Sequence, residues 1–214
     1  MALSLADAGL LLISFALPLV LVLGAMPPFR SYLIRSGRVV DDVHKRPVTK
    51  VPTPGGPVVA LGAVVGELAV FLLTGSLVPV AVGSAAAIAF AVGIYDDLKV
   101  LGGLTKPLLL VLAGVPLVLL YLVQPTLYNP VLTFPFLGDT APHLTIYTIL
   151  ALAAFPIVAN AFNMMDSFNG QISWFSLLVS LAVLFGVSLR TWYAGNAAPA
   201  QVASVLPLVG ISLG

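Results

Sequence analysis

Cysteine is absent from this 214-residue sequence, so neither a disulfide framework nor thiolate chemistry is available to it. Charge is also scarce, because Asp, Glu, Lys and Arg make up 8% of the residues against about 25% in an ordinary soluble domain. The two histidines, His44 and His143, are single and far apart in the sequence, and we expect them to be loop residues and not metal ligands. These absences exclude an ordinary soluble domain and a disulfide-stabilised one.

Long apolar runs take the place of the missing charge, and 60% of the residues are hydrophobic. A bilayer core about 30 Å thick needs about 20 apolar residues for each helical span. The sequence therefore predicts an all-α, polytopic transmembrane helix bundle with about seven spans. The expected spans are 8–29, 57–74, 78–95, 107–123, 145–162, 173–189 and 199–214.

We expect residues 1–214 to form a single transmembrane domain. The last apolar segment, from Pro199 to Gly214, stops after sixteen residues without a charged or aromatic anchor. The sequence is therefore interpreted as a C-terminally truncated fragment whose reading frame continues. The loop 124–144 contains four prolines, which argue against a helix there.

The distribution of cations predicts the orientation of these spans. Six of the nine Lys and Arg residues follow the first span, and two more follow the third; the opposite loops hold only Arg190. Cytoplasmic loops carry an excess of Lys and Arg. We therefore expect the loops after spans one and three to be cytoplasmic and the N-terminus to lie outside.

The first polar cluster runs from His44 to Gly56 and is cationic. Three prolines fix the backbone there, and Gly55-Gly56 allows it to approach another group closely. A phosphate-bearing partner would suit such a loop. A basic loop that only sets topology and touches anionic lipid headgroups is an equal alternative.

The second cluster begins with Asp96 and Asp97 at the cytoplasmic end of the third span. Adjacent carboxylates at a helix C-terminus face an unfavourable dipole and each other's charge, so they need compensation. Mg²⁺, which prefers oxygen ligands and substrate phosphates, would supply it. Lys99 and Lys106 are close enough in sequence to bind phosphate at the same place. The alternative is a solvated helix end with local ion pairs.

The third cluster extends from Asn160 to Gly170, again at the cytoplasmic end of a span. Asn160 and Asn163 are three residues apart and so share a helix face. Asp166 and Asn169 follow before Gly170. A capped helix turn would explain one asparagine and the glycine but not four polar groups, and unpaired amides are costly at the end of an apolar span. The three clusters together predict one acidic and amide-rich site on one membrane face.

The two Asp/Asn motifs, in this order and downstream of the Pro-Gly-Gly loop, resemble those of the polyprenyl-phosphate N-acetylhexosamine-1-phosphate transferase superfamily. Residues 102–107, Gly-Gly-Leu-Thr-Lys-Pro, are most similar to archaeal relatives of the eukaryotic dolichyl-phosphate GlcNAc-1-phosphate transferase. The resemblance implies a ten-helix fold and transfer of a sugar phosphate from a UDP-N-acetylhexosamine, expected to be UDP-GlcNAc, to a polyprenyl or dolichyl phosphate, with release of UMP. It implies dependence on Mg²⁺, with Mn²⁺ as an alternative.

The resemblance also assigns roles by position. Asp96, Asp97 and Lys106 match catalytic and phosphate-handling residues, and Asn163 matches an asparagine that ligates Mg²⁺. The residues expected to bind substrate are Lys99, Asn160, Asp166, Asn169 and Gly170. Asp166 and Asn169 fall in the nucleoside-binding motif, with Asn169 at the uracil. No nucleic-acid partner is expected, and a homodimer is left open.

The sequence departs from the family pattern at two places. Ser167 replaces a usual glycine, and the later loops that carry a Gly-Asp metal motif and a sugar-recognition motif are absent. Gly138-Asp139 imitates the metal motif but is expected on the opposite membrane face, so we reject it as a metal site.

A membrane transporter with an intracellular metal or anion site is the alternative function, because transporters also place acids and amides in membranes. It predicts charged residues near the middle of spans, and Glu67 alone meets that condition. We expect Glu67 to be an interhelical hydrogen-bond partner more often than part of a transport pathway. A membrane scaffold, the third alternative, would leave the asparagines unexplained.

Overall fold

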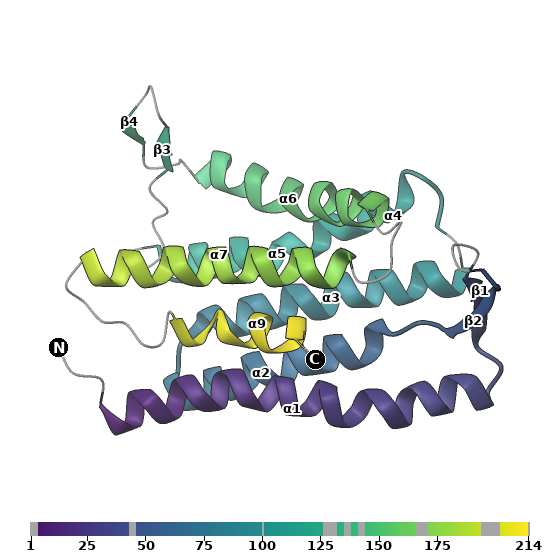
Figure 1. The fold of residues 1–214 in the computed structure, drawn as a ribbon. Helices are drawn as coiled ribbons and strands as arrows, with labels where there is room; N and C mark the ends of the chain where they lie inside the picture. The colour runs from purple at the N-terminus through teal and green to yellow at the C-terminus, as the bar shows by residue number, and fades with distance from the viewer. Residues whose placement is uncertain are drawn as a thin grey trace. The chain divides into compact units, whose positions relative to one another are not determined.

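The computed structural model consists mainly of long helices (Figure 1). The structure describes residues 4–42, 46–99, 101–125, 132–134, 138–140, 144–165, 171–193 and 202–213. The chain divides into two compact units, one formed by residues 1–79 and 164–214 and the other by residues 80–163. The expectation of a single domain stays a prediction, and each unit is considered by itself.

Six helices are long and apolar enough to cross a membrane, which confirms the predicted all-α, polytopic class. They begin and end within a few residues of the predicted spans, except that the first extends well beyond its predicted end. Their bounds are α1 (Leu5–Arg35), α2 (Gly56–Thr74), α3 (Leu77–Lys99), α4 with α5 (Thr105–Leu110 and Val115–Val123), α6 (Leu144–Met165) and α7 (Gln171–Tyr193).

Two of the predicted spans differ from continuous helices. The fourth is interrupted by the 3₁₀ segment η1 (Val111–Gly114) between α4 and α5. The run expected at 199–214 contains helix α9 (Leu206–Leu213), which is eight residues long. An apolar run specifies burial in lipid or protein, but it does not distinguish one unbroken helix from shorter helical pieces.

Two antiparallel hairpins lie in the loops and were not predicted. Strand β1 (Val39–Asp42) pairs with β2 (Thr49–Pro52), and β3 (Leu132–Phe134) pairs with β4 (Gly138–Thr140). The second hairpin lies in the proline-containing loop, where we expected no helix. Each strand has three or four residues, which is too short for an alternating pattern to be recognised in the sequence.

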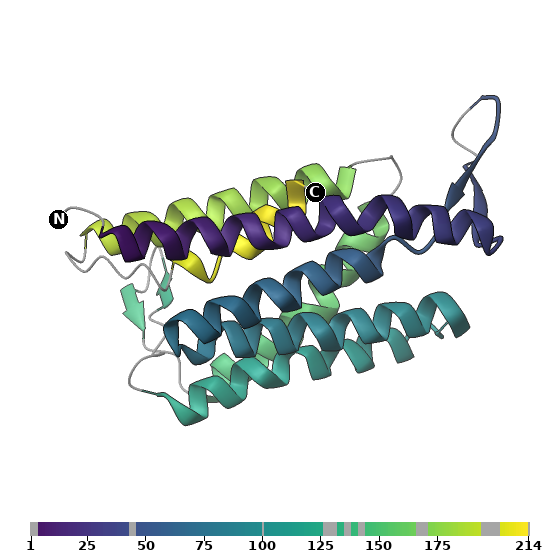
Figure 2. The same ribbon diagram turned by 90° about the horizontal axis from the view of Figure 1, so that it is seen from below.

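Close helix contacts hold the first unit together. Helix α9 packs against α1, α2 and α7, and α1 packs along α2 (Figure 2). The contact between α1, α2 and α9 depends on glycines: a Cβ on Gly66 would lie 2.8 Å from Cβ of Pro207, and one on Gly62 would lie 2.7 Å from Cγ2 of Val22. Small residues allow such approach between helices in a bilayer, where no hydrophobic force draws them together.

Glu67 lies in this packed region, next to Gly66, and its exposed fraction is 1%. Neither carboxyl oxygen of Glu67 has a hydrogen-bond partner in the described part of the chain. The expectation that Glu67 makes an interhelical hydrogen bond is therefore wrong for the described residues.

The second unit is built on α6 packed against the interrupted fourth span. The backbone of α6 at Ala151 comes so close to Gly114 that a Cβ there would clash with the Ala151 carbonyl. One turn further, the Tyr147 hydroxyl donates a hydrogen bond of 3.4 Å to the Leu117 carbonyl. The rings of Tyr147 and Tyr121 lie 4.9 Å apart between centroids. Gly114 meets Ala151, whereas the later residue Leu117 meets the earlier residue Tyr147, so the two segments run antiparallel.

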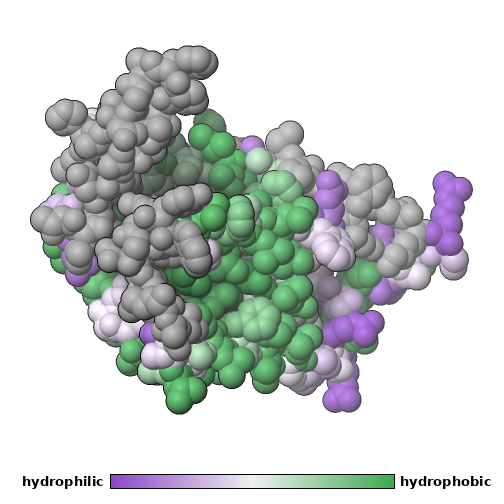
Figure 3. All heavy atoms as spheres, turned by 60° about the vertical axis from the view of Figure 1, so that its left-hand side comes forward, coloured by the Kyte–Doolittle hydropathy of each residue, from purple (hydrophilic) through white to green (hydrophobic). Residues whose placement is uncertain are grey.

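The described surface is largely apolar, as the green area in Figure 3 shows. Large side chains such as Leu72, Leu108 and Phe185 are more than 60% exposed. Exposed apolar side chains over six long helices are favourable only where lipid surrounds them, so the chain is an integral membrane protein.

Replacing Gly66 with alanine should destabilise the first unit. The added methyl group would press on Pro207 and Pro18, whose rings cannot turn away. We expect a cost of about 1–3 kcal/mol in the free energy of unfolding, seen as a lower melting temperature in detergent.

Gly24→Ala is the matched control, because a Cβ on Gly24 in α1 meets nothing within 4 Å. Alanine is the better helix former, so this variant should melt at the same or a higher temperature. Equal melting temperatures for the two variants would contradict the proposed packing.

Candidate functional site

The candidate site begins at the C-terminal end of α3, where Asp96 and Asp97 follow the apolar part of the helix. The helix ends at Lys99, and residues 101–104 form a turn that leads into α4. The amide of Thr105 donates a hydrogen bond of 2.9 Å to the Gly102 carbonyl within this turn. The turn therefore brings the start of α4 back beside the end of α3.

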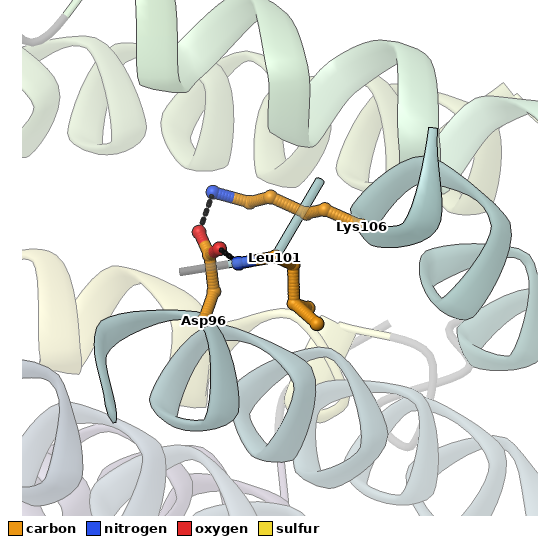
Figure 4. A network of polar contacts seen from close by, with 3 residues as sticks. All are labelled: Asp96, Leu101 and Lys106. Carbon is orange, nitrogen blue, oxygen red and sulfur yellow. Dashed lines mark hydrogen bonds and ion pairs between the residues drawn. The ribbon is translucent and has the colours of Figure 1, made fainter. Parts of the chain in front are cut away.

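Asp96 joins the two helices through both carboxylate oxygens (Figure 4). Lys106 Nζ lies 2.7 Å from Oδ2, and the backbone amide of Leu101 donates a hydrogen bond of 2.7 Å to Oδ1. The side chains of Asp96 and Lys106 are 19% and 25% exposed, so water screens the pair only in part. The pair fixes Lys106 at the end of the second unit and holds the intervening turn.

Asp97 and Lys99 take no part in this network of contacts. Both are exposed, and Asp97 forms no hydrogen bond or ion pair within the described residues. Lys99 Nζ lies 5.5 Å from the centre of the Tyr95 ring, in a cation–π contact. The two adjacent aspartates therefore have different environments: Asp96 is engaged by protein groups, whereas the Asp97 carboxylate is available to a ligand.

Asn160 lies on α6 at the same end of the second unit as Lys106. The contact between Gly114 and Ala151 sets the register of the two antiparallel segments. Lys106 lies eight residues before Gly114 and Asn160 nine residues after Ala151, distances of about 12 and 14 Å along a helix axis. Both residues therefore lie toward the same end of the second unit, and Asn160 is exposed.

The rest of the third predicted cluster is only partly described. Helix α6 continues to Met165, so Asn160 and Asn163 do occupy neighbouring positions on one helix face. The side chain of Asn163 lies outside the described part of the chain, as do residues 166–170, which include Asp166, Asn169 and Gly170. Their expected roles stay predictions.

The available donors suit one mode of Mg²⁺ binding. Three or more Asp, Glu or His side chains do not gather anywhere in the described residues, which argues against an all-protein cage there. Mg²⁺ commonly uses one or two carboxylates together with substrate phosphates and water. The exposed carboxylate of Asp97 fits that mode, whereas Asp96 is already neutralised by Lys106.

The sequence analysis did not identify two residues of this site, Tyr95 and Leu101. Tyr95 is four residues before Lys99 on one helix, and this spacing could have indicated their contact. The amide of Leu101 carries no side-chain signal, because the turn alone brings this backbone group to Asp96.

The ion pair predicts different effects of removing the two aspartates. Asp96→Asn and Lys106→Gln should each lower the melting temperature in detergent, and a double-mutant cycle should give a coupling of about 0.5–1 kcal/mol for a partly exposed pair. Asp97→Asn, the matched control, should leave the melting temperature unchanged. Zero coupling between Asp96 and Lys106 would refute the pairing.

Comparison with known proteins places these residues in a family. The family model described as glycosyl transferase family 4 matches residues 79–214, which include the aspartate pair and the asparagine cluster. A protein of Sulfolobus acidocaldarius is 30% identical over 171 residues, which cover 75% of this chain and 50% of that protein. One from Saccharolobus solfataricus is 27% identical over 139 residues, covering 64% of this chain and 41% of that protein.

Both relatives carry the provisional name UDP-N-acetylglucosamine–dolichyl-phosphate N-acetylglucosaminephosphotransferase. The chain spans about half the length of the curated relatives it matches. The family match agrees with the resemblance seen in the Asp and Asn motifs and gives no support to a transporter. Because the model covers well over half of the sequence, the chain belongs to glycosyl transferase family 4.

Proposed function

We propose that this protein transfers N-acetylglucosamine 1-phosphate from UDP-N-acetylglucosamine to a dolichyl or related polyprenyl phosphate. The provisional names of the two relatives support this substrate pair. The observation that carries the proposal is the pair of neighbouring carboxylates at the end of α3, of which Asp96 holds a lysine and Asp97 is free.

In the proposed reaction, an oxygen of the lipid phosphate attacks the phosphorus that carries the sugar. A new P–O–P bond forms, the existing diphosphate bond breaks, and UMP leaves with the electron pair. Phosphoryl transfer of this kind requires mainly positioning and neutralisation of negative charge. Cationic and metal-binding groups at the end of a membrane helix would suit a lipid phosphate that approaches from the bilayer.

The residues of the site divide these tasks. Lys106, held by Asp96, would contact phosphate, and the exposed Lys99 would add a second positive charge. Asp97 and Asn163 would hold Mg²⁺, or Mn²⁺ in its place, which when bound would neutralise the diphosphate. Asn160, Asp166, Asn169 and Gly170 would bind the nucleotide sugar, with Asn169 at the uracil.

We further propose that this site faces the cytoplasm and that the N-terminus lies outside. The excess of Lys and Arg in the loops after α1 and α3 supports this orientation. The site residues Lys99 and Lys106 flank the second of these loops, at the end of α3 and the start of α4. A homodimer is compatible with the proposed chemistry but is not required by it.

Asp97→Asn should abolish transfer without affecting membrane insertion. Removal of a preorganised charged group costs about 3 kcal/mol of transition-state stabilisation, or about a hundredfold in rate. The measurement is formation of lipid-linked sugar from labelled UDP-N-acetylglucosamine and dolichyl phosphate, using membranes that contain the complete gene product.

Asp41→Asn removes an exposed carboxylate in the β1–β2 hairpin and serves as the matched control. It should keep its activity. Near-normal product formation by the Asp97 variant, at equal protein level, would overturn the proposed function.

A magnesium titration separates metal ligation by Asn163 from helix capping. If its side-chain oxygen binds the ion, Asn163→Ala should raise the Mg²⁺ concentration that gives half-maximal activity, and Asn163→Asp should restore part of the affinity. If Asn163 only caps the helix, alanine should lower stability by about 1 kcal/mol and leave the metal midpoint unchanged. Melting curves of the same two variants in detergent provide the comparison.

A further inference from the structure

The C-terminal end of α1 and the β1–β2 hairpin form a basic surface to which the proposed function assigns no role. We call this surface the basic arm, comprising residues 30–42 and 46–52. Between Arg30 and Lys50 the sequence contains six Lys or Arg residues and two aspartates. Five of these cations are exposed and form no ion pair within the described part of the chain: Arg30, Arg35, Arg38, Arg46 and Lys50.

The basic arm is joined firmly to α1. Gly37, with φ of 71°, ends the helix, and the amide of Arg38 donates a hydrogen bond of 2.9 Å to the Leu33 carbonyl. The Gly37 amide donates one of 3.1 Å to Ile34, which completes a Schellman motif. The Thr53 amide then bonds the Arg38 carbonyl at 3.1 Å and closes the base of the hairpin. The hairpin is therefore held in a defined position at the helix end, as Figure 2 shows.

The length of α1 places this arm at the membrane surface. Its 31 residues extend about 46 Å, whereas the hydrocarbon core is about 30 Å thick. Because the apolar run of α1 ends at Phe29, the last turns and the hairpin lie at the level of the lipid headgroups or beyond.

Apolar side chains are exposed among the cations of the arm. Tyr32 and Val48 are each 57% exposed, and Ile34 and Val40 are each 50% exposed. The Tyr32 ring stacks on Phe29, with centroids 6.3 Å apart, a placement typical of aromatic residues at a membrane interface. Cations mixed with exposed apolar groups suit an anionic lipid surface, because apolar groups enter the interface while the cations meet phosphates.

We propose that the basic arm lies on the headgroup layer of the membrane and binds anionic lipid there. The charges near the arm support this choice over neutral lipid. Asp41 is the cross-strand partner of Lys50, and the arginines Arg30, Arg35, Arg38 and Arg46 form no ion pair within the described residues. A loop whose cations served only to orient the chain during insertion would need neither a fixed hairpin nor exposed valines.

Because the chain has no cysteine, a single introduced cysteine reports on one position. Val48→Cys would be labelled with an environment-sensitive dye, and the protein reconstituted in phosphatidylcholine vesicles with increasing fractions of phosphatidylglycerol. We expect quenching by lipids spin-labelled near the headgroup to rise with the anionic fraction and to fall at high salt. The same dye on Leu5→Cys, at the opposite end of α1, should not respond to the anionic fraction.

Charge variants of the arm provide the decisive comparison. Arg38→Gln, Arg46→Gln and Lys50→Gln should each weaken the association about fivefold, measured as a higher anionic fraction at half-maximal quenching. Asp41→Asn, which removes a negative charge from the same hairpin, should lower that fraction. The proposal would be overturned if quenching did not depend on the anionic fraction. It would also be overturned if the variants reached half-maximal quenching at the same anionic fraction as the parent protein.

Addition of UDP tests whether the basic arm binds the nucleotide substrate instead of lipid. If the arm binds lipid, quenching at Val48 should be unchanged by UDP. Release of the label from the membrane by UDP would instead assign these cations to the substrate and overturn the proposal. The proposed transferase function would survive either result.

Discussion

Hydrocarbon offers no hydrogen-bond partners to a polypeptide backbone, and most of this structure follows from that constraint. Each apolar segment that crosses the bilayer must satisfy its amides internally, and the helix does so. With no water to expel, the helices associate through close packing, which is why Gly62 and Gly66 lie against Val22 and Pro207. Gly114 plays the same part where α6 meets the interrupted fourth span.

The same constraint confines functional polar groups to the helix ends. At the end of α3, charge and partial hydration allow Asp96 and Lys106 to pair while Asp97 stays accessible. Glu67 provides the contrast within one chain, since it is buried among helices without a hydrogen-bond partner in the described residues. A carboxylate at a helix end can interact with a lysine or a ligand, whereas the buried Glu67 in the middle of α2 finds no hydrogen-bond partner among the described residues.

The Asp96–Lys106 pair also gives the candidate site its internal order. Two adjacent carboxylates would repel each other and compete for the same cation. Engagement of Asp96 by Lys106 and the Leu101 amide removes that competition and leaves Asp97 exposed. In the proposed function, such a site would handle phosphate through a few positioned charges.

The sequence by itself determined the membrane class and six of the seven expected spans. It could do so because apolar length and charge placement depend on the solvent and not on particular contacts. The helical spacing of Asn160 and Asn163 followed from local periodicity alone. The short hairpins and the 3₁₀ break in the fourth span did not, because too few residues carry each signal.

Only the tertiary structure decided which aspartate is engaged and which is free. Asp96 and Asp97 are chemically identical neighbours, and the difference between them comes from the direction in which the last turn of α3 points each side chain. The turn at 101–104 then returns Lys106 and the Leu101 amide to one of the two. Likewise, the sequence showed that Glu67 lies within a span, but only the structure shows that its side chain is buried without a hydrogen-bond partner among the described residues. Such orientations are set by contacts between segments distant in the sequence, which local pattern does not encode.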